Sequence, residues 1–413
     1  DFEAYALQDV IVLWELVYWI LDLHRKFDVG LSVSLADLAG KIFRKHHVKK
    51  EIEPTNHHVT MAALSSYHGG KTEKYVEGVT LIKDIHEYDI TSAYPFAMTQ
   101  IGNFSDYEIQ PWKKSSQIEK NGVYQISTDL ACPYRCLYNE DFQRINTLDK
   151  QWVTGWELAS ALKQDCLKGL EICQGYVMIS HNEKENGLKD YVDTFFARKQ
   201  QADKEKNLTE RLASKLFLNA LYGKFISKIQ EEKDELESWK GGVIFHPLIA
   251  TLITGFVRAY VHDIEHVSQC FHTSTDSFIT KHATLDSFFP GVKGLGTLKK
   301  EYSGDALIIR PKVYVIFDSI DPDCHHKFDI DETKKVYCVY CQAKTLKSAT
   351  HGFYGSVHML LNMWKGGKTN YVVNRMVRLK EAMRRRDPDV LPFVFTNHRR
   401  SLNVDWSTMN VRR

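Results

Sequence analysis

The sequence predicts an α+β fold with two or three sub-domains, and three observations support this. A chain of 413 residues, 43% of them hydrophobic, is long enough to bury more than one core. Apolar residues recur with helical spacing over 4–27, 187–227 and 247–266. Two segments that contain several β-branched residues, at 81–90 and 307–317, predict strands between these helices.

The remaining segments are assigned in chain order. A second helix is expected over 32–48, and SSYHGGK at 65–71 is a loop whose two glycines free the backbone for a close approach. Pro95 suits the first turn of a helix after the strand 81–90. Residues 100–186 mix short strands and turns, which indicates an insertion with its own small core. Two short strands are expected within 269–281.

Charge is distributed unevenly along the chain. The formal net charge is only +2, yet residues 365–413 carry twelve Lys or Arg against four Asp or Glu, a net +8 that leaves −6 for the rest. A basic C-terminal segment suits a part that binds phosphates, although a solvated helix face has the same composition.

Cysteine usage and the N-terminal segment bear on the compartment. Eight cysteines without a secretory signal indicate a reducing, cytoplasm-like compartment. The longest apolar stretch, Val10 to Leu21, is short and interrupted by Glu15, so we expect a buried helix and no membrane span. The start at Asp1, without Met, indicates a fragment or an excised domain.

Two cysteine clusters contain residue types that bind zinc. In VYCVYC, interpreted as a strand, residues three apart point to opposite faces, so both thiolates could not easily reach one ion. Zinc is therefore the disfavoured interpretation at both clusters. The clusters are Cys324, His325 and His326 with Cys338 and Cys341, and CPYRC with Cys132 and Cys136.

The segment YDITSAYP places Asp89 at a strand end, just before a turn into a helix. A carboxylate there can bind a metal while the turn amides face a phosphate. Tyr94 is expected near the same pocket. Taken alone, an Asp at a strand end is more often a helix cap.

In KLFLNALYG, the residues Lys215, Asn219 and Tyr222 share one face of a helix, and Gly223 permits close packing at its end. Lys and Asn on this face suit a triphosphate and Tyr suits a base, while a plain amphipathic helix is the alternative.

Two further segments carry candidate residues. Asp276 lies near the tip of a hairpin in HTSTDSFIT, where Asp is also an ordinary turn residue. Lys312 and Tyr314, in PKVYV, are two apart on a predicted strand and would share a face, as they also would on a generic edge strand.

The ordered set of these segments is more specific than any one of them. It resembles the family B DNA polymerases, and most closely the protein-primed group of phages, viruses, organelles and linear plasmids. That group shows a YxGG loop, DxxSLYP, KxxxNSxYG, a DTDS hairpin and KxY in this order. The matching segments are Tyr67 to Gly70, Asp89 to Pro95, Lys215 to Gly223, Thr275 to Ser277 and Lys312 to Tyr314, within a resemblance from about Tyr5 to Met383.

The resemblance implies a right-hand fold of palm, fingers and thumb, and a two-metal site for adding deoxynucleotides to a primer. Asp89 and Asp276 would bind two Mg²⁺ ions, which Mn²⁺ can replace, and the carbonyl of Ile90 would complete a metal shell. Tyr94 would exclude the 2′-hydroxyl of an incoming ribonucleotide and so favour deoxynucleotides. The other implied nucleotide contacts are Arg198, Lys215, Asn219, Tyr222 and Gly223, and the implied DNA contacts are Tyr67, Gly69, Gly70, Lys312 and Tyr314.

The resemblance also implies a domain plan and partners. The partners are primer–template DNA, dNTPs and a terminal protein that primes synthesis, for a monomer in host cytoplasm, or in mitochondria for a linear plasmid. The plan is the end of a 3′–5′ exonuclease domain with a linker (1–55), palm (56–99), a terminal-protein-binding insertion (100–186), fingers (187–227), a short second insertion (228–241), palm (242–340), and palm end with a basic thumb (341–413). Because the second insertion is short, we expect weak strand displacement.

Three departures from the family pattern narrow these expectations. Ser274 stands where the hairpin usually has its first Asp, and Ala220 stands where Ser is usual. Tyr5 and Asp9 fit the motif that ends the exonuclease domain, but an exonuclease needs about four acidic groups around its metals, so proofreading is not predicted. The alternatives are a catalytically impaired polymerase-like nucleic-acid-binding protein, an RNA-directed or RNA-making polymerase, and a two-metal nuclease.

Overall fold

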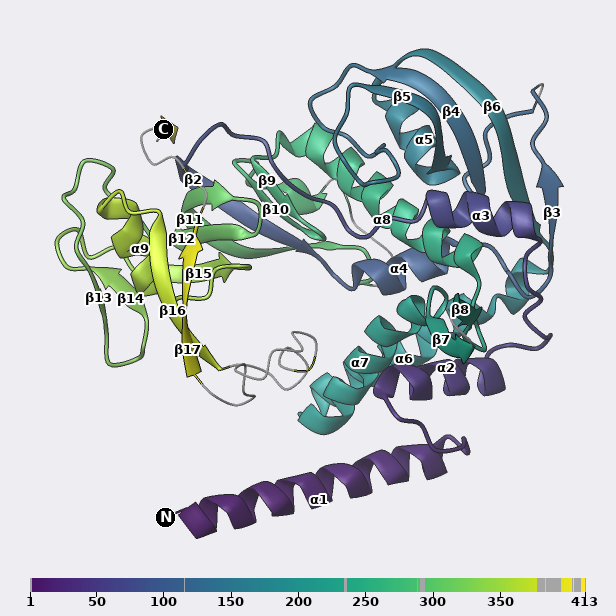
Figure 1. Cartoon of the computed structure of the whole chain (residues 1–413), viewed down its shortest axis with the longest axis horizontal. Helices are drawn as coiled ribbons and strands as arrows, with labels where there is room; N and C mark the ends of the chain where they lie inside the picture. Colours follow the sequence, from purple (N-terminus) through teal and green to yellow (C-terminus); the bar gives the residue numbers. More distant parts are fainter. Residues whose placement is uncertain are drawn as a thin grey trace. The chain divides into compact units, whose positions relative to one another are not determined.

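The computed structural model describes residues 2–114, 116–233, 236–287, 289, 294–376, 383, 395–402, 404 and 410–412 (Figure 1). The chain divides into two compact units, each assembled from separate segments. Unit 1 comprises 1–70, 92–264 and 292–296, and unit 2 comprises 71–91, 265–291 and 297–413.

Most helices belong to unit 1, and side-chain caps define where several of them begin. Ser34, Asn56 and Asn207 each accept a hydrogen bond from an amide in the first turn of the following helix, which satisfies one of its unpaired donors. The helices are α1 (Phe2–Lys26), α2 (Leu35–His46), α3 (His57–Ser65), α4 (Ala93–Gln100), α5 (Gly155–Lys163), the short η1 (Glu183–Glu185), α6 (Gly187–Lys204), α7 (Leu208–Lys224) and α8 (Pro247–Ser268), whose last residues lie in unit 2.

The insertion predicted over 100–186 does have its own core. Four antiparallel strands form a sheet in the order β3-β6-β4-β5, covered by α5. Tyr124, Ile126, Leu148 and Leu158 are among its buried core residues. The strands are β3 (Tyr107–Pro111), β4 (Gly122–Leu130), β5 (Thr147–Thr154) and β6 (Leu167–Ser180).

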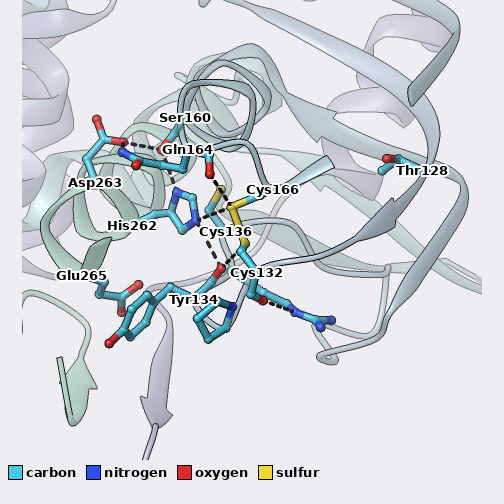
Figure 2. The surroundings of a disulfide bond; sticks show 12 residues. Thr128, Cys132, Tyr134, Cys136, Ser160, Gln164, Cys166, His262, Asp263 and Glu265 are labelled. Carbon is cyan, nitrogen blue, oxygen red and sulfur yellow. Dashed lines mark hydrogen bonds between the residues drawn. A yellow bond between two sulfur atoms is a disulfide. The ribbon is translucent and has the colours of Figure 1, made fainter. Parts of the chain in front are cut away.

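A disulfide between Cys132 and Cys166 closes one end of this insertion, as Figure 2 shows. The Nε2 atom of His262, on α8, lies 3.7 Å from Cys166 Sγ, and its Nδ1 lies 2.8 Å from Ser160 Oγ. This bond was not predicted from the sequence. The reducing, cytoplasm-like compartment expected from the sequence stays a prediction.

The helical hairpin predicted over 187–227 is confirmed as α6 and α7. Tyr191, Phe195 and Phe217 pack in its interior, and the Tyr191 hydroxyl donates to the carbonyl of Phe217 over 3.1 Å. The short segment 228–241 forms a two-stranded hairpin of β7 (Lys228–Lys233) and β8 (Leu236–Gly241).

Helix α1 corrects one expectation, because it is exposed rather than buried. Trp14 is 63% exposed and Leu13 is 60% exposed. By length and apolar composition alone the segment Glu3–Lys26 could cross a membrane, a property it shares with core helices of soluble proteins. Isolated helices of this length gain most of their stability from packing, and among the described residues little packs on this one.

Unit 2 is built on an eight-stranded sheet in the order β1-β9-β10-β2-β11-β12-β15, with β18 pairing to β2 in parallel. Alternate residues of β12 enter two different cores: Val313, Val315 and Phe317 face one, Tyr314 and Ile316 the other. The sheet is therefore buried on both faces. Its strands are β1 (Thr72–Lys74), β2 (Thr80–Ile90), β9 (His272–Ser274), β10 (Ser277–Thr280), β11 (Leu298–Arg310), β12 (Val313–Phe317), β15 (Thr345–Thr350) and β18 (Asn410–Arg412).

The single strand predicted over 307–317 is wrong, because the chain turns at Pro311 and Lys312. Lys312 has a φ of 61°, in the left-handed region, and β12 begins after it. Pro311 has no N–H to donate to a ladder, which favours a turn. Lys312 and Tyr314 are therefore not neighbours on one strand face.

The remaining described elements of unit 2 are η2 (Leu285–Ser287), the small hairpin of β13 (Phe328–Ile330) and β14 (Val336–Cys338), α9 (Val357–Lys365), and the hairpin of β16 (Asn370–Met376) and β17 (Phe395–Ser401). Residues of β13, β14, α9 and β16 share a buried core with Val313, Val315 and Phe317, on one face of this sheet. Much of the basic segment assigned to the thumb, 377–382 and 384–394, lies outside the described residues.

Candidate active site

Asp89 is the penultimate residue of β2, in the interior of the unit 2 sheet. It pairs in register with Ser277 of β10 on one side and with Lys299 of β11 on the other. The strand ends at Ile90, and the chain then turns through Ser92, whose φ is 54°. The sequence prediction of a carboxylate at a strand end before a helix is confirmed.

Asp276 occupies the two-residue turn between β9 and β10. Thr275 takes the left-handed conformation, with a φ of 62°, as two-residue hairpin turns require. The Ile90 amide donates to the Asp276 carbonyl over 2.8 Å. Since Ser277 is the register partner of Asp89, the structure brings the two predicted carboxylates to adjacent positions of one sheet.

The electrostatics of this pair favour a bound cation. Burial, and then the charge of Asp276, raise the pKa of Asp89 to about 7. Burial also raises the pKa of Asp276. Burial disfavours the ionised form of both carboxylates, and a cation between them would stabilise it.

A buried network missed by sequence reasoning lies on the same face of β2. Glu87 is fully buried, and its Oε1 accepts hydrogen bonds from the Tyr314 hydroxyl and from Lys347 Nζ, each over 2.7 Å. Lys347 also lowers the pKa of Asp89, against the larger effect of burial. The period of two along a strand places Glu87 beside Asp89, and this signal could have identified it.

A second buried network supports the turn that carries Asp276. The Thr275 amide donates to the carbonyl of Lys71 over 2.8 Å. Lys71 is 1% exposed and forms an ion pair with the fully buried Glu265, which also accepts from Thr273 Oγ1 over 2.6 Å. Glu265 thus binds both Lys71, which precedes β1, and Thr273 of β9, and removal of either charged partner would leave a charge buried.

The donor set fits hard divalent cations. Carboxylate oxygens are the ligands that Mg²⁺ and Mn²⁺ prefer, and Asp89 and Asp276 provide them. The Oε2 atom of Glu87 is buried without a hydrogen-bond partner among the described residues, so the face has acceptor capacity beyond the two aspartates. Ser274, at the end of β9, adds no charge to this set.

In unit 1, the predicted face of α7 is present. Lys215 and Asn219 are exposed, while Tyr222 is half-buried, so the two polar groups point to solvent on one side of the helix. Apart from its chain neighbours and the backbone of its own helix, no heavy atom of the described residues lies within 4 Å of where a Cβ would stand on Gly223. That space is open to a bound group.

Three tyrosines predicted for nucleotide and DNA contacts gather in unit 1. The rings of Tyr94, on α4, and Tyr222, on α7, stack with centroids 4.3 Å apart. Burial raises the pKa of Tyr67, with a further contribution from Tyr222. Residues 155 positions apart in the sequence thus form one aromatic cluster, which sequence order alone does not reveal.

Arg198, predicted to contact the triphosphate, already has a carboxylate partner. Its Nη2 lies 2.6 Å from Glu210 Oε1, and its guanidinium lies 5.0 Å from the ring centroid of Phe27. Its neighbour Lys199 was missed. Burial lowers the pKa of Lys199, and so do the charges of Arg211 and Lys215, so this amine belongs to the basic surface of the hairpin.

The loop Tyr67 to Gly70 is held by a buried arginine. Arg258, on α8, is fully buried and donates from Nη1 to the carbonyls of His68 and, over 3.0 Å, Gly69. Glu157 accepts from Arg258 Nε over 2.6 Å. The loop that was predicted to contact the template therefore has a fixed backbone.

Tyr5 and Asp9 lie on the exposed helix α1, and Tyr5 is 67% exposed. Their assignment to an exonuclease motif stays a prediction.

The fold is that of a right-hand polymerase. The structure of Phi29 DNA polymerase complexed with primer-template DNA matches 93% of this chain and 70% of that one, with a TM-score of 0.65 and 15% sequence identity. At this identity the likeness shows the shared fold alone.

The chain belongs to the family of DNA polymerase type B, organellar and viral, whose model matches residues 2–243. It is 26% identical over 265 residues to a DNA polymerase of Acidianus bottle-shaped virus (isolate Italy/Pozzuoli), covering 61% of this chain and 38% of the relative. It is 26% identical over 243 residues to a probable DNA polymerase of Podospora anserina, covering 57% and 19%. A DNA-directed DNA polymerase of Enterobacteria phage PRD1 is 21% identical over 331 residues, covering 70% and 56%. The matched part of the chain thus spans 38% of the length of the viral relative, 19% of the Podospora anserina relative and 56% of the phage PRD1 relative.

Proposed function

We propose that the protein is a template-directed DNA polymerase that adds deoxynucleotides to a primer 3′-hydroxyl, or to a protein hydroxyl, by two-metal phosphoryl transfer. The observation that carries this proposal is the main-chain bond between Ile90 and Asp276, which sets Asp89 and Asp276 side by side on the unit 2 sheet. Family membership supports the same reaction.

In the proposed reaction the primer oxygen attacks the α-phosphorus of a dNTP. A new P–O bond forms, the bond to the β-phosphate oxygen breaks, and pyrophosphate leaves with the bonding electron pair. Asp89 and Asp276 would hold two Mg²⁺ ions, which, when bound, activate the hydroxyl and stabilise the charge of the pyrophosphate. Mn²⁺ has the same ligand preference and would replace Mg²⁺.

The other residues would bind and select the substrates. Lys215, Asn219 and Lys199 supply hydrogen-bond donors for the triphosphate, which carries several negative charges. Tyr94, held by its stack on Tyr222, would occupy the space of a ribose 2′-hydroxyl and so favour deoxynucleotides. Arg258 would keep the Tyr67 to Gly70 loop in place for the template.

Primer extension tests this proposal. Wild-type protein with Mg²⁺ is expected to extend a primed template with dNTPs and to incorporate rNTPs poorly, whereas Tyr94→Val narrows the difference between the two. If wild type binds primer–template but extends nothing in Mg²⁺ or Mn²⁺, the polymerase proposal fails. The alternative, suggested by Ser274, is then a polymerase-like binding protein.

We also propose priming by a terminal protein through the insertion 100–186. Its separate sheet and core, closed by the Cys132–Cys166 disulfide, make it a self-contained surface on unit 1. A Lys168→Ala/Glu171→Ala variant, which changes exposed residues of β6 and keeps Glu157, should extend a DNA primer normally but initiate poorly on a protein hydroxyl. Loss of both activities to the same extent would contradict this role.

A further inference from the structure

A group of cysteines and a histidine lies away from the carboxylates, in the segment between β12 and β15. Cys324 ends a turn, and His326 follows just before β13. Cys338 is the last residue of β14, and Cys341 lies in the turn after it. The strand expected through VYCVYC is wrong beyond Cys338, because the chain turns there, and this turn brings both thiols to one side.

The four ligand atoms lie within 4.8 Å of one another. His326 Nδ1 is 3.4 Å from Cys338 Sγ and 3.7 Å from Cys341 Sγ, and Cys324 Sγ is 3.9 Å from Cys338 Sγ. In a tetrahedral zinc site with Zn–S of about 2.3 Å and Zn–N of about 2.0 Å, N–S edges are about 3.5 Å and S–S edges about 3.8 Å. The spacing of the group is that of a zinc ligand set without the ion.

The surroundings of His326 also favour a bound zinc ion. His326 is only 7% exposed, between the rings of Phe328 and Trp364, and its Nε2 has no hydrogen-bond partner among the described residues. Its Nδ1 faces the sulfur atoms of Cys338 and Cys341.

We propose that Cys324, His326, Cys338 and Cys341 bind one Zn²⁺ ion as a closed structural site. Four protein ligands leave no open position, so this ion takes no part in the nucleotidyl transfer. Three sulfurs and one nitrogen select zinc over the hard cations that suit Asp89 and Asp276. The site is thus separate in chemistry from the catalytic one.

The bound ion would stabilise the small hairpin of β13 and β14. β13 and β14 have three residues each, and a two-stranded sheet of this length is marginal on its own. Phe328 pairs with Cys338, so an ion held by the loop before β13 and by the turn after β14 would cross-link the two strands at the open end of this hairpin. Phe328, Cys338 and Trp364 belong to one buried cluster, so the cross-link would anchor that cluster at the sheet.

Metal content tests the proposal on the full chain. Purified wild type is expected to carry about one Zn²⁺ per chain by elemental analysis, and to give the intense absorption of tetrahedral thiolate-bound Co²⁺ when reconstituted with that ion. The double variant Cys338→Ser/Cys341→Ser should hold at least tenfold less. Cys173→Ser, which removes an exposed free thiol elsewhere, is the matched control and should bind as wild type does.

Two further measurements keep the test decisive if the double variant fails to fold. His326→Cys should retain the ion and shift the Co²⁺ spectrum to that of four thiolates. In folded wild type, a strong chelator should make Cys324, Cys338 and Cys341 open to alkylation, as mapped by mass spectrometry, and added Zn²⁺ should protect them again. Wild type that binds neither Zn²⁺ nor Co²⁺, or thiols whose labelling ignores chelator and zinc, would overturn the proposal.

Discussion

Ile90 donates its amide hydrogen to the carbonyl oxygen of Asp276 over 2.8 Å, so the two segments that carry the candidate metal ligands are joined by their main chains. This bond uses no side-chain atom of Asp89 or Asp276. Substitution of either carboxylate should change the chemistry and leave this backbone geometry intact.

The first prediction concerns these two carboxylates. Asp89→Asn and Asp276→Asn should each reduce primer extension about a thousandfold or more, because each loses a metal ligand and several kcal/mol of transition-state stabilisation. DNA binding should change little. Glu332→Gln, an exposed carboxylate of unit 2, is the control and should extend normally. Near-normal extension by Asp276→Asn would rule out its role.

The second prediction concerns pH and the metal-free protein. Asp89 has a pKa of about 7 when folded against 3.8 ordinarily, so between these values the folded chain binds more protons than the unfolded one. Stability of the metal-free protein should therefore fall as pH rises from about 4 to about 7. Melting temperatures in EDTA would show this decline, and Mg²⁺ at high pH should reverse it. The melting temperature of Asp89→Asn should depend less on pH and on Mg²⁺ than that of wild type. An equal dependence would show that Asp89 is not the group that titrates.

The third prediction concerns the basic surface of the α6–α7 hairpin. Lys215→Ala and Lys199→Ala should each raise the KM for dNTPs about tenfold or more, since a charged hydrogen bond is worth about 1.5–3 kcal/mol. Steady-state kinetics on a fixed primer–template would measure this. Lys204→Ala, at the exposed end of α6, should leave KM unchanged. A similar rise in that variant would indicate a general charge effect.

The fourth prediction concerns Arg258 and Glu157. Both are buried, so Arg258→Met alone should destabilise the protein by about 3–5 kcal/mol, because it leaves the Glu157 charge unpaired. Urea unfolding of Arg258→Met, Glu157→Leu and the double variant would test this. The double variant should be more stable than the sum of the single effects predicts, and strict additivity would show that the pair is not coupled.

The fifth prediction concerns Ser274, the residue that departs from the family pattern. Ser274→Asp adds a carboxylate at the end of β9, next to the turn with Asp276, and should lower the Mg²⁺ concentration needed for half-maximal extension. Ser274→Asn, of similar size without charge, is the control. If both variants behave alike, the effect is steric and the missing charge is unimportant.

The sequence was sufficient for the elements whose pattern is local. The strand before Asp89, the hairpin at Asp276 and the α6–α7 pair could be predicted because periodicity and turn residues act over a few positions. Lys312 shows the limit of such reasoning. A run of apolar residues looks continuous across Pro311, and only the register of β11 with β12 shows that it is two strands.

The family and the order of its motifs could be predicted from the amino-acid sequence, and so could Asp89 and Asp276 as candidate metal ligands, because each motif is a short contiguous pattern. The tertiary structure decided which distant groups share a face. It placed Lys347 against Glu87 beside Asp89, buried Arg258 beneath the loop after Tyr67, and gathered Cys324 and His326 with Cys338 and Cys341. These contacts depend on strand register and on turns that bring separated residues together, and no local pattern encodes them.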